Sequence, residues 1–124
     1  MIGLDVTHRA RLGEAEADVL RGAGRFGAFV AKLLDFFLPN YRRRMGFDSA
    51  PIHDALAVAH VIWPDLVTTE LLAVEIDTTD GPSAGRTLVD RYHVTGRSPN
   101  VRVGVSVDSE RFARLVVDRI SALG

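Results

Sequence analysis

The sequence contains no cysteine, which excludes a disulfide scaffold, a thiol nucleophile and any metal site with cysteine ligands. It also lacks an excess of charge of either sign, because 15 Lys and Arg residues stand against 16 Asp and Glu residues, for a formal net charge of −1. A balanced charge provides no basic surface for nucleic acid or for an anionic membrane. We therefore expect neither as a partner.

Long apolar runs are missing as well. No run approaches the roughly 20 residues that span a bilayer, and Asp5 interrupts the only early apolar stretch, so the N-terminus does not resemble a secretory signal. The length of 124 residues suits one domain, and the hydrophobic fraction of 47% is ordinary for globular proteins. These features predict a soluble, cytoplasmic single domain over residues 1–124.

The first half of the chain is predicted to be mainly helical. Apolar residues from Phe26 to Phe37 recur at helical spacing, and Pro39 is expected to end that helix because proline disfavours helical backbone in the residue before it. A loop or broken helix is expected to follow. The other predicted elements are a buried strand at Met1–Val6, a helix at Glu14–Arg21 and a buried helix at His53–Ile62.

The second half is rich in Val, Ile and Leu between turn residues. Strands are predicted at Leu72–Ile76, Gly85–Val89 and Val101–Val107, followed by a helix that begins at Asp108 or Ser109. The fold class is therefore α/β. The strand at Met1–Val6 has two apolar faces, which is typical of parallel sheets with neighbours on both sides. Either another chain completes this sheet, or the natural polypeptide is longer.

The densest group of chemically active residues is His53 and Asp54, which lead into an apolar helix. Two ionisable residues at such a place are costly unless they are paired, bind a metal or face a cleft. One interpretation is that either residue simply caps the helix. Another treats His53 and His60, seven residues apart, as core histidines. The functional interpretation makes Asp54 a carboxylate ligand and His53 a proton donor.

Four motifs occur in order along the chain: Gly3–His8 (GLDVTH), His53–Ala59 (HDALAVA), Gly85–Thr87 (GRT) and Asp108–Phe112 (DSERF). In this order and spacing the chain resembles the inosine-uridine preferring nucleoside hydrolases, calcium-dependent N-glycosidases that split ribonucleosides into base and ribose. The resemblance covers essentially the whole chain, as the C-terminal portion of a family member. Ala55 departs from the family pattern, which commonly has proline there.

The resemblance implies a fold and a set of roles. The fold would be the C-terminal part of an open, mostly parallel sheet with flanking helices. Asp54 would coordinate the active-site Ca²⁺, His53 would protonate the departing base, and Tyr41 would bind substrate from a flap over the base. An ordinary surface tyrosine is the alternative for Tyr41. The arginines at 42–44 are expected to form a solvated face, and Asp5 and His8 are expected to be structural.

Two family features are absent from the sequence: the Asp-rich loop that supplies most of the calcium ligands, and the Asn and Glu residues that hold the ribose hydroxyls. Calcium takes six to eight oxygens, of which Asp54 offers at most two. The isolated chain is therefore expected to bind calcium weakly or not at all and to be a poor enzyme. Two functions stay open: part of a longer, homo-oligomeric hydrolase acting on ribonucleosides, or a non-catalytic α/β module kept as an assembly or binding surface.

Overall fold

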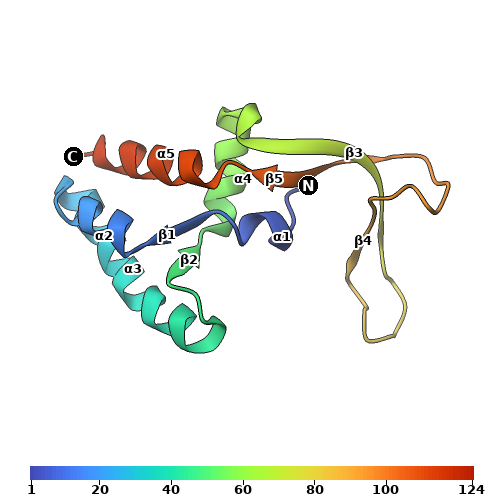
Figure 1. Ribbon diagram of the computed structural model, residues 1–124, viewed down its shortest axis with the longest axis horizontal. Coiled ribbons are helices and arrows are strands. Elements are labelled where there is room, and N and C mark those ends of the chain that lie inside the picture. The colour runs from blue at the N-terminus through green and yellow to red at the C-terminus, as the bar shows by residue number, and fades with distance from the viewer.

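The computed structural model describes residues 1–124 and is a mixed α/β structure (Figure 1). Its first residues differ from the predicted strand. Only Met1 pairs with another strand, and a single helical turn, α1 (Leu4–Thr7), follows Gly3. The Gly3 carbonyl accepts hydrogen bonds from the Val6 and Thr7 amides at 3.1 and 3.0 Å, which closes that turn. The strand predicted over Met1–Val6 is therefore wrong from Leu4 onward.

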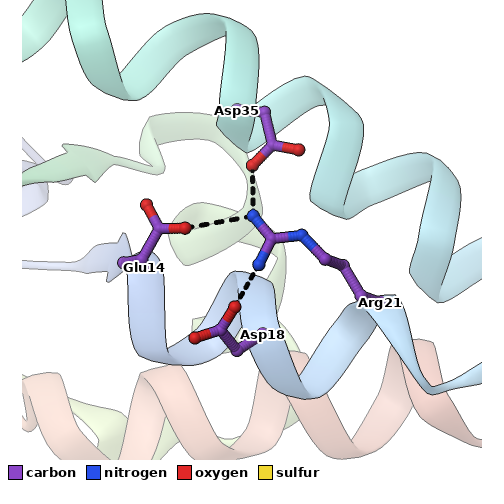
Figure 2. A network of polar contacts seen from close by, with 4 residues as sticks. All are labelled: Glu14, Asp18, Arg21 and Asp35. Carbon is purple, nitrogen blue, oxygen red and sulfur yellow. Dashed lines mark hydrogen bonds and ion pairs between the residues drawn. The ribbon is translucent and has the colours of Figure 1, made fainter.

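The next two helices form an antiparallel pair at one end of the molecule (Figure 1). Helix α2 (Glu14–Arg21) has the predicted bounds, and α3 (Gly24–Met45) packs against it. Figure 2 shows the Arg21 guanidinium donating to Glu14 at 3.0 Å, to Asp35 at 2.5 Å and to Asp18. Because Asp35 belongs to α3, this network ties the two helices together on their exposed side.

Helix α3 continues through Pro39, so the predicted helix end at this residue and the predicted loop after it are wrong. Pro39 has no N–H to give the preceding turn. Leu34 and Leu38, each only 3% exposed, anchor the helix in the core, and burial there offsets the lost hydrogen bond. The helix ends at Gly46, whose φ of +69° lies in the left-handed region that glycine favours.

Two short strands pair with each other in the first half of the chain. Strands β1 (Arg11–Gly13) and β2 (Ser49–Pro51) pair antiparallel, with Leu12 opposite Ala50. The Ile52 amide donates to the Ala10 carbonyl at 2.8 Å and extends this pairing to the start of helix α4 (His53–Ile62). The structure confirms the helix predicted at His53–Ile62.

A three-stranded sheet forms the other end of the molecule. It has the order β4-β3-β5 and consists of β3 (Val67–Ile76), β4 (Thr87–Asp90) and β5 (Val101–Val107), preceded by a short 3₁₀ helix η1 (Pro64–Leu66). Both pairings are antiparallel, so the predicted mostly parallel sheet is wrong. The connections at 77–86 and 91–100 carry no crossover helix, which parallel neighbours need.

One trace of parallel pairing remains at the N-terminus. The Met1 amino group donates to the Arg102 carbonyl at 2.7 Å, and the Met1 carbonyl accepts from the Gly104 amide at 2.8 Å. In a parallel pair, one residue forms hydrogen bonds to two residues of the neighbouring strand that are two positions apart. Met1 therefore lies beside β5, on the edge opposite to β3.

The last helix, α5 (Ser109–Ser121), packs against α2, α3 and β1. Asp108 caps it by accepting from the Arg111 amide at 3.0 Å, as predicted. Fully buried Phe112 packs in the main core cluster with the other residues Val6, Ala10, Leu56, Ala59, Leu66 and Val67. A second cluster lies between α2, α3 and β2. Only 22 of 124 residues are buried, and no helix is long and apolar enough to cross a membrane.

Candidate functional site

The candidate site lies where the amino end of α4 meets α1. Val6 of α1 and Leu56 of α4 are both fully buried in the main core cluster, which holds the two elements together. The bond from the Ile52 amide to the Ala10 carbonyl fixes the chain just before α4. These contacts place Thr7 beside His53, although the two residues are 46 positions apart.

The ring of His53 is held from two sides. Its Nδ1 lies 2.7 Å from the Thr7 hydroxyl oxygen, and the Thr7 residue is only 4% exposed. The ring of His8 meets it edge to face, with ring centres 5.2 Å apart and planes at 89°. The other ring nitrogen of His53, Nε2, has no hydrogen-bond partner in the protein and is not buried. It is therefore the nitrogen that a ligand can reach.

His53 and Asp54 line the same cavity of about 350 Å³. Thr7, Ala57 and Thr87 of β4 also line it, together with the extended N-terminal residues 1–4. The cavity thus combines two ionisable side chains, a hydroxyl pair and an apolar floor. A cleft with a few convergent polar groups is the usual form of a small-molecule site.

Asp54 is exposed at the start of α4 and makes no hydrogen bond or ion pair. The positive end of the helix dipole favours a carboxylate there. No group of three or more His, Asp or Glu residues in the chain could hold a metal ion. Since calcium takes six to eight oxygens, the residues of this chain do not form a calcium site by themselves.

The structure also decides the alternative interpretations of this pair. The residue at the N-cap of α4 is Ile52, and no side chain caps the helix, so neither His53 nor Asp54 is a cap. His60 lies on the same helix, and its Nδ1 is buried without a hydrogen-bond partner. His53 differs from His60, because the Nδ1 of His53 has a hydrogen-bond partner and its Nε2 has none.

Tyr41 is not among the residues that line the cavity at His53. It lies half-buried on α3 and packs against the second core cluster. The neighbouring arginines lie on the surface, where Arg42 donates to Asp48 at 2.8 Å and Arg43 donates to Asn40 at 3.3 Å. Substrate binding by Tyr41 stays a prediction, whereas these two arginines form the expected solvated face.

Thr7 is the site residue that sequence reasoning missed. The motif Gly3–His8 contains it, but the sequence pattern assigns it no role in the site. In the structure its hydroxyl makes one of two contacts between the motif and His53, and the ring of His8 makes the other. No periodicity or spacing predicts a contact across 46 residues, so the only available signal was its place inside a family motif.

Comparison with known proteins agrees with this arrangement. The sequence model described as inosine-uridine preferring nucleoside hydrolase matches residues 1–114. The chain belongs to this family. The resemblance found in the sequence motifs is thereby confirmed, and the fold of this family member carries the His53–Asp54 pair at the amino end of α4.

Relatives and solved structures of the family resemble the chain over almost its full length. It is 39% identical over 123 residues to the pyrimidine-specific ribonucleoside hydrolase RihA of Klebsiella pneumoniae, with 98% of this chain and 40% of the relative covered. It is 40% identical over 122 residues to RihA of Escherichia coli strain HS, with 97% of this chain and 39% of that relative covered.

Among solved structures, the purine-preferring ribonucleoside hydrolase from Gardnerella vaginalis matches with a TM-score of 0.85 and 35% identity over 99% of this chain and 39% of that one. The plant nucleoside hydrolase PpNRh1 matches with a TM-score of 0.84 and 26% identity over 97% of this chain and 40% of that one. The chain therefore spans about two fifths of the length of the family members that it matches.

Proposed function

We propose that the chain is a single folding unit that forms the C-terminal portion of a ribonucleoside hydrolase and contributes His53 and Asp54 to its active site. The observation that carries the proposal is geometric. Both residues line one cavity, and the Nε2 of His53 is neither hydrogen-bonded nor buried. Family membership supports the reaction class, and we propose that the other parts of the site belong to the rest of a longer hydrolase.

The reaction is the hydrolysis of an N-glycosidic bond. The bond between the anomeric carbon and the base nitrogen breaks, and its electron pair leaves with the base. A water oxygen forms the new bond to the anomeric carbon. The His53 ring stabilises the negative charge that develops on the base by donating a hydrogen bond from Nε2, and the proton that the base gains is balanced by the one that water releases.

Asp54 is proposed to add its carboxylate to a metal site whose other ligands lie outside this chain. Its exposure, its lack of any protein partner and its position at a helix N-terminus leave it free for that role. Two relatives differ in base preference by name, one pyrimidine-specific and one purine-preferring, so the substrate class proposed here is ribonucleosides as a whole. We expect the complete enzyme to be a cytoplasmic homo-oligomer.

The proposal is tested with a chimera in which this chain replaces the matching portion of the Escherichia coli RihA relative. We expect the chimera to release ribose from uridine or inosine in a reducing-sugar assay. The 124-residue chain alone is expected to release none, because it lacks a calcium site and the ribose-binding residues. Robust turnover by the isolated chain would show that other residues build the site.

The chimera also separates the two functions left open by the sequence. A folded chimera without activity, while the parental relative is active under the same conditions, contradicts the hydrolase proposal. That outcome supports a non-catalytic module instead. Circular dichroism and size-exclusion chromatography establish folding independently of turnover.

A further inference from the structure

We infer that Thr7 and His8 are positioning residues that hold His53 with its proton on Nε2, the ring nitrogen that is neither buried nor bonded within the protein. The position of the proton is inferred from hydrogen-bond geometry alone, and only its effect on catalysis rests on the proposed function. A neutral histidine carries one proton on one of two nitrogens, and the partner of the other nitrogen decides which. For His53 that partner is the Thr7 hydroxyl, 2.7 Å from Nδ1.

The Thr7 hydroxyl has one proton and two acceptors within reach. One is His53 Nδ1 at 2.7 Å, and the other is the Leu4 carbonyl oxygen at 3.5 Å. The two choices have opposite results. If the hydroxyl donates to Nδ1, the His53 proton resides on Nε2. If it donates to Leu4, it accepts from an Nδ1–H instead, and Nε2 is left bare.

The Leu4 carbonyl is already occupied. It accepts from the His8 amide at 2.9 Å, and the His8 ring lies against it with Nδ1 at 2.7 Å. Since a carbonyl oxygen only accepts, the proton of that second contact belongs to His8 Nδ1. A carbonyl has two lone pairs, and two closer donors use both. The Thr7 proton therefore goes to His53, the nearer acceptor by 0.8 Å, the difference of the two distances.

Two adjacent histidine rings are thus expected in opposite tautomers. His8 carries its proton on Nδ1 and His53 carries it on Nε2. The edge-to-face contact between the rings, with centres 5.2 Å apart, restrains the same orientation. Since Thr7 is only 4% exposed, little of this residue is open to water.

The consequence for the site is a preorganised hydrogen-bond donor. The hydroxyl that donates to Nδ1 cannot accept from it at the same time. The arrangement therefore favours a His53 ring that presents Nε2–H to the base nitrogen as negative charge develops there. In this role Thr7 and His8 act through His53, without touching the substrate.

Nitrogen-15 NMR of the 124-residue chain in alkaline buffer, where imidazole is neutral, reads the tautomer of each ring directly. Four histidines are present, and single His→Gln variants assign their signals. Exposed His93 makes no hydrogen bond and provides an internal reference. We expect the ratio of the Nε2–H tautomer to the Nδ1–H tautomer to be about fivefold higher in His53 than in His93. A factor of this size corresponds to the net free energy of one neutral hydrogen bond. His8 is expected to favour Nδ1–H.

Two Thr7 variants form a matched pair. Thr7→Ser keeps the hydroxyl and should keep the His53 ratio, whereas Thr7→Val keeps the shape and should bring the ratio to that of His93. A His53 ratio no higher than that of His93 in the unmodified chain overturns the inference, and so does a ratio that Thr7→Val leaves unchanged. If Thr7→Val fails to fold, the unmodified chain and Thr7→Ser still decide.

The measurement needs no activity, so it separates this inference from the proposed function. The expected tautomers in the chain together with an inactive chimera would leave the positioning role standing and contradict the hydrolase role. An active chimera whose turnover and His53 tautomer both survive Thr7→Val would keep the hydrolase role and contradict the positioning role.

Discussion

At the residue scale, His53 is the side chain on which the proposed chemistry depends. In the RihA chimera, we expect His53→Ala to lower turnover about 10² to 10³-fold, the usual loss when one hydrogen-bond donor to a developing negative charge is removed. The loss should be much smaller for a nitrophenyl riboside, whose leaving group needs no proton. Steady-state kinetics on both substrates measure the difference. Equal losses would leave His53 as a positioning or structural residue.

Asp54 is expected to contribute to metal affinity and little to the stability of the fold, since its side chain is exposed and has no partner. In the same chimera, Asp54→Asn should raise the calcium concentration needed for half-maximal activity while the fold is retained. Activity measured across a calcium titration after chelator treatment tests this prediction. A calcium dependence that stays unchanged would exclude Asp54 as a ligand. The exposed Asp48, which pairs with Arg42, provides a control position.

At the scale of elements, the close packing of α2 on α3 depends on Gly27. A Cβ atom at this position would lie 2.4 Å from the Leu20 carbonyl oxygen and 2.9 Å from the Ala23 Cβ. We therefore expect Gly27→Ala to lower the free energy of unfolding by about 1–3 kcal/mol, as overpacking does. Urea denaturation measures the loss.

Gly22→Ala is the matched control for this change. Gly22 has an ordinary φ of −89°, and a Cβ there would meet nothing closer than 3.8 Å. The substitution should leave stability unchanged or raise it by about 0.4–1 kcal/mol. Equal destabilisation by both substitutions would mean that the helix pair does not depend on close approach at Gly27.

The turn between β3 and β4 is organised by Asp77. Hydrogen bonds from Ser83 and Thr79 hold the pKa of Asp77 below its ordinary value of 3.8. Because the folded pKa is the lower one, the stabilising contribution is complete above about pH 4 and is lost as the pH falls through the folded value.

We expect the Thr79 amide proton signal to titrate with a midpoint below 3.8, because that amide donates to the Asp77 carboxylate at 2.9 Å. Proton NMR across an acid titration measures it, and Asp77→Asn should abolish the transition. A midpoint at or above 3.8 would contradict the bonding seen in this turn. The exposed turn at Asp90, with donors from Val94 and Thr95, should titrate in the same direction.

At the scale of the whole molecule, much apolar surface is uncovered. Helix α3 exposes Phe29 by 61% and Phe36 by 76%, and a groove of about 620 Å³ between α4 and α5 has eight apolar residues among the nine that line it. Surface of this kind drives association. We predict that the isolated chain self-associates, most simply as a symmetric dimer of two copies.

Light scattering across a dilution series tests the prediction of self-association. The apparent mass should fall as the chain is diluted, and Phe29→Ser with Phe36→Ser should shift the transition to higher concentration. The RihA chimera should associate less through these faces, because the remainder of the family fold is available to cover them. A compact monomer at micromolar concentration with cooperative unfolding would mean that the chain is self-sufficient.

Local patterns in the sequence determined several features of this protein. The sequence located α2, α4, α5 and the first part of α3. It also located β4, β5 and the second half of β3, and the four motifs identified the family. The adjacent His53 and Asp54 were visible as a pair of ionisable residues at the start of an apolar helix. These features depend on neighbours in the chain, and the sequence displays such neighbours directly.

Only the tertiary structure decided the remaining features. Strand direction depends on which strands meet. Pro39 stays helical because the turn before it is held in the core by buried Leu34 and Leu38, and α1 replaces a predicted strand because the Gly3 carbonyl closes a turn. The bond from Thr7 to His53 spans 46 residues. Each outcome balances a local preference against packing between distant segments, and packing carries the larger free energy wherever side chains are buried.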